Sequence, residues 1–326
     1  MSEDAIGIDE IKAAHERIAP YIHRTPVLTS QTLDDAVGSQ LFFKCENFQK
    51  SGAFKVRGAF NALLSLSPED AARGIVTSSS GNQAAAVSLA ARFRSVKAHI
   101  AMPKVAVKSK VAAVERYGGN IVWVEAKGRI PTSEEYDATT DAIQERTGAN
   151  LVHPYDDLRT IAGQATCALE LLEDVSDLDL LLAPVGGGGL LSGTCLAAAT
   201  RGSKTKVIGC EPEGADDAQQ SLRQGVIVPQ TNPQTIADGL RTSLGEHTFP
   251  IIARHVTDIV TVSEEAILRA MRRVWETMKI VIEPSAAVPV AALLEKKISS
   301  DSRRIGVILS GGNVDLESLP PWTAAS

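Results

Sequence analysis

The sequence predicts an α/β fold with two parallel sheets, each in a three-layer arrangement with helices on both faces. Strand-like and helix-like segments alternate through most of the 326 residues, as they do in right-handed strand–helix–strand units. Residues 178–183 are almost wholly apolar, which is typical of a parallel strand buried on both faces. Four glycines follow this segment and suit the start of a helix that binds an anion.

Two series of elements follow one another along the chain. The first has strands at residues 74–78, 96–102 and 120–125, and helices at residues 83–93, 109–117 and 134–147. The second has strands at residues 178–183, 206–210, 259–262 and 304–309, and helices at residues 161–173, from about 190, 264–279 and 285–297. Pro284 fits the start of the last helix, where its missing N–H costs nothing. The two series predict two domains with a cleft between them: a large domain of residues 1–66 and 152–326, and a small mobile domain of residues 67–151.

Composition excludes several classes of protein. A net charge of −6 gives no basic surface for nucleic acid. The four cysteines, which form no Cys-x-x-Cys pair, indicate a reducing cytosol rather than disulfides or zinc. The acidic N-terminus does not suit a secretory signal, and no apolar run approaches the ~20 residues needed to cross a bilayer. We therefore expect a cytoplasmic protein that binds neither nucleic acids nor membranes.

The glycine run Gly186, Gly187, Gly188 and Gly189 predicts a phosphate site. Its backbone N–H groups can point at one anion, and the helix that follows adds its dipole. No P-loop lysine follows, and no Gly-x-Gly-x-x-Gly with a ribose-binding acid is present. A compact phosphate monoester is therefore favoured over a nucleotide; the alternative is a tight turn without a ligand.

Lys55 lies among small residues and beside Phe54 in residues 51–59, SGAFKVRGA. This segment is too glycine-rich for an ordinary amphipathic helix, although most lysines are simply solvated surface residues. A lysine held in such a setting can form a Schiff base with an aldehyde cofactor. Together with the phosphate site, it indicates pyridoxal 5'-phosphate (PLP), and hence amino-acid chemistry.

Residues 51–59 resemble the PLP-attachment signature of the fold-type II serine/threonine dehydratase and serine racemase family. The resemblance covers nearly the whole chain, with further motifs at residues 24–28, 79–82, 186–189, 237–239, 282–286 and 310–313. It implies a tryptophan synthase β-like fold, in which PLP lies in the cleft between a large cofactor-binding domain and a small substrate-binding domain. It also implies a homodimer acting on a small amino-acid substrate.

The resemblance also implies a role for individual residues. Lys55 would carry PLP as a Schiff base and then act as the base at the substrate Cα. Cofactor contacts would come from Phe54 beside the ring, Asn82 at the ring hydroxyl, the four glycines with Leu190 at the phosphate, Gly239 near the ring, Glu283 in the pocket wall and Ser310 at the pyridine nitrogen. Ser79, Ser80 and Asn82 would surround the substrate carboxylate at a helix N-terminus.

A hydroxyl such as that of Ser310 is a neutral partner, which need not hold the ring nitrogen protonated as a carboxylate would. PLP is then a milder electron sink, which favours β-elimination of a hydroxyl to give a 2-keto acid and ammonia. The alternative for Ser310 is a turn residue at a strand end.

Ser80 leaves racemase activity as an alternative function, because a serine on the face of the substrate opposite Lys55 can deliver a proton to Cα. The alternative role for Ser80 is to cap the helix that follows. Sulfur β-replacement and a non-catalytic phosphate-binding module are more distant alternatives.

The resemblance further implies a divalent-cation site formed by Glu211, the carbonyl of Ala215 and Asp217. Hard oxygen ligands in a loop suit Mg²⁺, or else Ca²⁺ or Mn²⁺. Such a metal would be structural or allosteric rather than catalytic. The alternative is a solvated acidic loop.

Two residues depart from the family pattern in the expected substrate site. Gln83 stands where the family usually has histidine. Tyr136 stands where racemases and hydroxyaspartate-acting relatives carry an arginine, so the chain lacks a bidentate clamp for a second substrate carboxylate. Tyr136 could instead line a larger side-chain pocket or lie on the helix surface. Serine and threonine remain the default substrates, a bulkier 3-hydroxy amino acid remains open, and we expect no regulatory domain.

Overall fold

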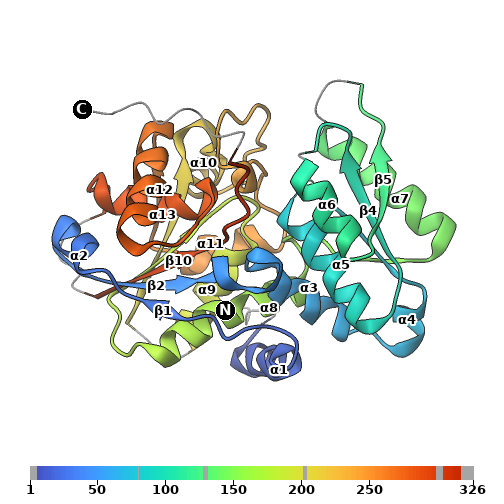
Figure 1. Ribbon diagram of the computed structural model, residues 1–326, viewed down its shortest axis with the longest axis horizontal. Helices are drawn as coiled ribbons and strands as arrows, with labels where there is room; N and C mark the ends of the chain where they lie inside the picture. Colours follow the sequence, from blue (N-terminus) through green and yellow to red (C-terminus); the bar gives the residue numbers. More distant parts are fainter. Residues whose placement is uncertain are drawn as a thin grey trace.

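The computed structural model describes residues 6–79, 81–106, 108–127, 131–200, 204–298 and 304–316. Within them the chain forms two separate sheets, a six-stranded one and a four-stranded one, which lie side by side in Figure 1. The helix α3 (Lys55–Leu64) lies between the two sheets.

The large sheet has the strand order β1-β2-β10-β7-β8-β9. Its strands are β1 (Val27–Leu28), β2 (Gln40–Cys45), β10 (Arg304–Leu309), β7 (Leu180–Pro184), β8 (Lys206–Pro212) and β9 (Asp258–Val262). All neighbours are parallel except β1, which pairs antiparallel with β2. The carboxyl ends of the parallel strands therefore meet at one edge, where α/β proteins bind ligands.

Successive residues of the central strands contact opposite helix layers. Leu181 and Ala183 pack with α1 (Ile8–Ile18), α8 (Leu158–Asp174) and α9 (Gly189–Thr200). Leu180 and Leu182 pack with α2 (Gln31–Val37), α12 (Glu264–Met278) and α13 (Pro284–Leu294). Because β7 is covered by helices on both faces, its residues are apolar throughout. The helices α10 (Asp217–Gln224) and α11 (Thr248–His255) contribute to the same core cluster as α8 and α9.

The small sheet is parallel throughout, in the order β5-β4-β3-β6. Its strands are β3 (Ile75–Ser78), β4 (Ala98–Pro103), β5 (Asn120–Val124) and β6 (Asn150–Leu151). Ile75 faces the layer of α5 (Asn82–Arg94) and α6 (Lys108–Arg116), whereas Val76 faces Ile143 of α7 (Ser133–Thr147). The short α4 (Pro68–Ala72) leads into this unit.

Every predicted strand and helix is present, with ends that differ by a few residues. Pro284 lies in the first turn of α13, as predicted. The sequence interpretation missed β2, because its burial does not alternate and it contains the buried Lys44. It also did not foresee that the glycine-rich segment at Lys55 is helical. α3 is buried from Val56 to Leu63, so it needs no polar face.

The four cysteines are free and buried, in agreement with the prediction of no disulfide. None of the helices in the described ranges is long and apolar enough to cross a membrane.

Candidate functional site

Lys55 opens α3 at the carboxyl end of the large sheet. The N–H of Phe54 donates to the carbonyl of Ser310 (3.0 Å), and Ala53 bridges Gly311, so the start of α3 is attached to the end of β10. The Lys55 Nζ donates to the carbonyl oxygen of Pro154 (2.6 Å) and lies 5.2 Å from the centre of the Phe54 ring. The amine is therefore held in one position by a neutral acceptor.

Burial lowers the pKa of the Lys55 amine to about 8, because no charge from a described residue compensates for the lost solvation. A substantial fraction of the amine is then neutral near physiological pH. Only the neutral form has the lone pair that attacks a carbonyl. Lys55 is consequently suited to act as a nucleophile and as a base.

The glycine run forms a buried donor site between β7 and α9. The described residues offer no acceptor to the N–H groups of Gly186, Gly187 or Gly188, whereas the Gly187 carbonyl accepts from the Thr248 hydroxyl (2.9 Å). Buried N–H groups without partners at the start of a 12-residue helix favour an anion.

Close packing explains why glycine occupies these positions. A Cβ at Gly187 would lie 2.3 Å from the Tyr155 ring, and Gly188 has a φ of +89°. Tyr155 follows Pro154, whose carbonyl accepts from Lys55, and its ring contacts that of His153 at a centroid distance of 4.7 Å. One short segment therefore holds the lysine and the anion site next to each other.

A second group of polar residues connects the two sheets. Asn82, at the start of α5, donates from Nδ2 to Glu283 Oε1 (2.8 Å) and accepts from Asn313 Nδ2 (2.9 Å). Lys110 of α6 pairs with Asp238 of the large sheet unit. Burial and the negative charge of Asp238 raise the pKa of the Glu283 carboxyl to about 7. The small and large units thus meet through hydrogen bonds and an ion pair.

The remaining predicted substrate residues lie in different surroundings. Ser79 accepts from the Gly81 N–H (3.0 Å), while Ser80 lies outside the described residues. Gln83 is 2% exposed, and neither end of its amide has a partner among the described residues. Tyr136 is half-buried on α7. Burial raises the pKa of the Tyr155 phenol to about 12, and the negative charge of Asp137, the neighbour of Tyr136, adds a smaller contribution.

The other predicted cofactor residues lie around the same strand ends. Ser310 is buried directly after β10, and its carbonyl holds the start of α3. The Gly239 N–H donates to Ser285 Oγ (3.1 Å) near the start of α13. Leu190 is buried beside the glycine run in the first turn of α9.

A model of the pyridoxal-phosphate-dependent enzyme family matches residues 18–311. The chain belongs to this family. It is 47% identical to a β-hydroxyaspartate dehydratase of Paracoccus denitrificans, over 96% of this chain and 98% of that protein. It is 49% identical to a serine racemase of Arabidopsis thaliana, over 97% of this chain and 95% of that protein. The solved structure of maize serine racemase superposes with a TM-score of 0.92 at 48% identity, covering 96% of this chain and 95% of that one.

The site chemistry fits the cofactor of this PLP-dependent family. PLP offers an aldehyde and a phosphate, and the chain places a lysine of lowered pKa beside buried, unpartnered N–H groups. The structure brings Phe54, Lys55, Ser310 and the glycine run to one edge of the large sheet, and Asn82 with Glu283 to the junction of the two sheets. The sequence interpretation gave no site role to Tyr155, nor to Asn313, which lies at the end of the motif at residues 310–313.

The predicted cation ligands lie at the end of β8 (Glu211), in the turn that follows it (Ala215) and at the start of α10 (Asp217). The Glu211 carboxylate accepts from the N–H groups of Ala218 (2.9 Å) and Gln219 (3.0 Å), and Asp217 Oδ1 accepts from Gln230 (3.0 Å). Burial raises the pKa of Glu211 to about 9 and that of Asp217 to about 6, and Asp217 Oδ2 is buried without a partner among the described residues. Buried carboxyl groups of this kind favour a neutralising partner, which is either a proton or a cation. The described ranges contain no cluster of three His, Cys, Asp or Glu side chains.

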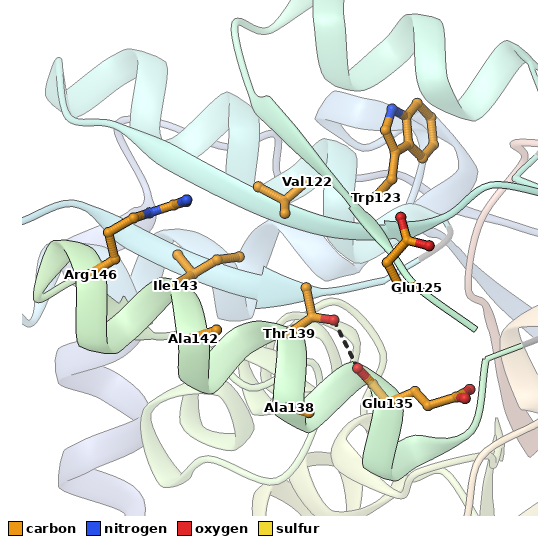
Figure 2. A pocket seen from close by; sticks show the side chains of 9 residues that line it. All are labelled: Val122, Trp123, Glu125, Glu135, Ala138, Thr139, Ala142, Ile143 and Arg146. Atoms are coloured by element: carbon orange, nitrogen blue, oxygen red, sulfur yellow. Dashed lines mark hydrogen bonds between the residues drawn. The ribbon is translucent and has the colours of Figure 1, made fainter. Parts of the chain in front are cut away.

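A separate pocket of about 370 Å³ lies between β5 and α7 (Figure 2). Its lining residues are Val122, Trp123, Glu125, Glu135, Ala138, Thr139, Ala142, Ile143 and Arg146. Glu135 is occupied by capping: it accepts from the N–H groups of Lys127 and Thr132 (both 2.9 Å), which lowers its pKa. None of the predicted site residues lines this pocket.

Glu283→Gln should stabilise the cofactor-free protein in a pH-dependent way. The Glu283 carboxyl has an ordinary pKa of 4.5 and a pKa of about 7 in the fold. The wild type therefore loses stability relative to the variant as pH rises from about 4.5 to about 7, by about 3 kcal/mol at most above pH 7. Urea unfolding at pH 5 and pH 8 measures this difference. Glu276→Gln, at an exposed position, should show no such gain; an equal advantage of Glu283→Gln at both pH values would contradict the assignment.

Proposed function

We propose that this chain is a PLP-dependent ammonia-lyase that converts a 3-hydroxy amino acid to a 2-keto acid and ammonia. The observation that carries the proposal is the position of the Lys55 amine, which the segment at Pro154 and Tyr155 holds beside the buried glycine run. The similarity to a β-hydroxyaspartate dehydratase supports elimination of a hydroxyl.

In this proposal the residues of the chain bind, orient and move protons. Bound PLP withdraws electrons from the substrate Cα, so that the Cα proton becomes acidic. The glycine run and Leu190 would hold the phosphate, Ser310 would offer a neutral hydroxyl to the ring nitrogen, and Gly239 would lie beside the ring. Phe54 would pack beside the ring, and Asn82, which donates to Glu283, would contact the ring hydroxyl.

Lys55 Nζ takes the Cα proton, because an amine of pKa about 8 both accepts and releases a proton near neutral pH. As the Cβ–O bond breaks, the hydroxyl leaves as water with the proton that Lys55 took from Cα. Hydrolysis of the resulting enamine then gives the 2-keto acid and ammonia. Ser79 and Ser80, with Asn82 and Gln83 at the α5 N-terminus, receive the substrate carboxylate.

The second candidate is an amino-acid racemase with dehydratase side activity, which the similarity to a serine racemase favours. In that case Ser80 would return a proton to Cα on the face opposite Lys55. The two candidates share every other residue, so the stereochemistry of the recovered substrate distinguishes them.

Cofactor attachment should depend on pH through Lys55. When PLP is added to the cofactor-free protein, the rate at which its visible absorption band forms should rise with pH and be half-maximal near pH 8, because the protonated amine below that pH cannot attack. Borohydride reduction and peptide mapping should place PLP on Lys55. Lys55→Ala should form no such band, and Lys50→Ala should behave as the wild type. A midpoint near 10.5, or PLP on another lysine, would refute the assignment.

Tyr136 should restrict the substrate to 3-hydroxy amino acids with one carboxylate. We expect serine or threonine to give a 2-keto acid without accumulation of the D-enantiomer, measured by keto-acid assay and chiral analysis. Tyr136→Arg should raise kcat/KM for 3-hydroxyaspartate relative to serine by about tenfold or more, because guanidinium pairs with a second carboxylate. Tyr136→Phe should not. A wild type that prefers 3-hydroxyaspartate would disprove this role, and accumulating D-serine would favour the racemase.

We also propose that residues 67–151 move as a small domain over the cofactor-binding remainder. The contacts from Asn82 to Glu283 and from Lys110 to Asp238 would then break and form as the substrate enters. A cytoplasmic homodimer remains part of the proposal.

A divalent cation, Mg²⁺ or Ca²⁺, is proposed at Glu211, Asp217 and the Ala215 carbonyl, where it would stabilise the loop before α10. Adding either ion should raise the melting temperature of the wild type by a few degrees, because the ion binds the folded state. Asp217→Asn should abolish the shift, while Asp216→Asn, at the adjacent carboxylate, should keep it. The absence of a shift in the wild type would rule out the site.

A further inference from the structure

A buried network of charges surrounds Arg57, two residues after Lys55 on α3. At about 100° per residue, the two side chains leave the helix on nearly opposite sides. All five N–H groups of Arg57 are bonded: two to Glu46 (both 2.8 Å), two to Glu170 (both 2.8 Å) and one to Thr166 Oγ1 (3.1 Å). Arg57 thus contacts neither the glycine run nor the Lys55 amine.

The network is electrically balanced and has no exposed member among its four ions. Lys44 Nζ binds Glu170 Oε2 (2.7 Å) and the carbonyl of Thr25 (2.8 Å), and the Thr25 hydroxyl donates to Glu46 (2.5 Å). The exposed fractions of Lys44, Glu46, Arg57 and Glu170 are 0–1%. Because buried charges require complete partners, the network strongly favours a single arrangement.

This arrangement sets the position of α3 on α8. Glu170 and Thr166 are on α8, and Gly58 and Asn61 of α3 also bond to that helix, through the Gln164 side chain (3.2 Å) and the Arg159 carbonyl (2.7 Å). The two helices touch so closely that a Cβ at Gly163 would lie 2.6 Å from the Arg57 carbonyl oxygen. Pro154, which accepts from Lys55, lies just before α8. A shift of α3 along α8 would therefore move the Lys55 amine away from its acceptor.

We propose that Arg57 is a positioning residue for Lys55: its two carboxylate pairs fix the first turn of α3 so that the amine stays aligned with the cofactor aldehyde. Stability alone does not explain the network, since apolar residues of similar volume often replace buried ion pairs without loss of stability. The planar guanidinium of Arg57, which bonds two carboxylates, fixes the orientation of α3, whereas a lysine at the same position would not. The inference rests on the proposed role of Lys55.

The test compares Arg57→Lys, which keeps the charge but loses the fork, with Lys44→Met, which removes a buried cation that is not on α3. In Arg57→Lys, the visible band should form about tenfold or more slowly when PLP is added, and kcat should fall similarly while KM changes within about twofold. Lys44→Met should attach PLP at close to the wild-type rate, even if its melting temperature falls as much.

Two results would overturn the inference. One is a rate of PLP attachment and a kcat in Arg57→Lys that equal those of the wild type. The other is a decrease in both quantities in both variants that is proportional to the decrease in melting temperature. If Arg57→Lys does not fold, Glu46→Gln, which keeps the side-chain size but breaks one of the two carboxylate pairs of Arg57, must show the same slow attachment. Failure of the wild type to carry PLP on Lys55 would instead refute the proposed function, so the two failures are distinguishable.

Discussion

The contact between α3 and α8 is the constraint on which the rest of the site depends. Gly163 lets the two helix backbones approach closely, because a Cβ there would lie 2.6 Å from both the Arg57 carbonyl oxygen and the Gly58 Cα. A Cβ at Gly58 would meet the side chains of Gln164 and Thr160 on α8. α3 carries the lysine, and the segment that leads into α8 carries both the acceptor of that lysine and the tyrosine that packs on the glycine run. One interface between helices therefore sets the distance between the attacking amine and the anion site.

Burial acts on the two main ionisable groups of the site in complementary ways. It lowers the pKa of Lys55 to about 8 and raises that of Glu283 to about 7. Both changes favour the neutral form, as expected where water is excluded and few opposite charges compensate. The site consequently has little fixed charge of its own, except for the Lys110–Asp238 pair at its margin. A dianionic phosphate is instead received by backbone dipoles, which do not titrate.

Sequence patterns predicted most of the fold because the strands and helices that they describe are locally determined. The apolar strand before the glycine run and the alanine-rich α5 are clear examples. The patterns failed where distant partners decide the outcome. β2 contains a lysine that is tolerated only because Glu170, far along the chain, neutralises it. Likewise, Lys55 and the glycine run were recognisable as motifs, but their connection through Pro154 and Tyr155 depends on the folded chain.

The position of β10 in the large sheet has a consequence for the order of events during synthesis. β10 lies between β2 and β7, and Arg304 is paired with Gln40, so the two parts of the sheet on either side of β10 are joined only after residues 304–309 have been synthesised. The small sheet uses strands from residues 75–151 alone and can assemble while the ribosome is still at work. Since the start of α3 is attached to Ser310, the nascent chain has no complete place for its cofactor until β10 has joined the sheet.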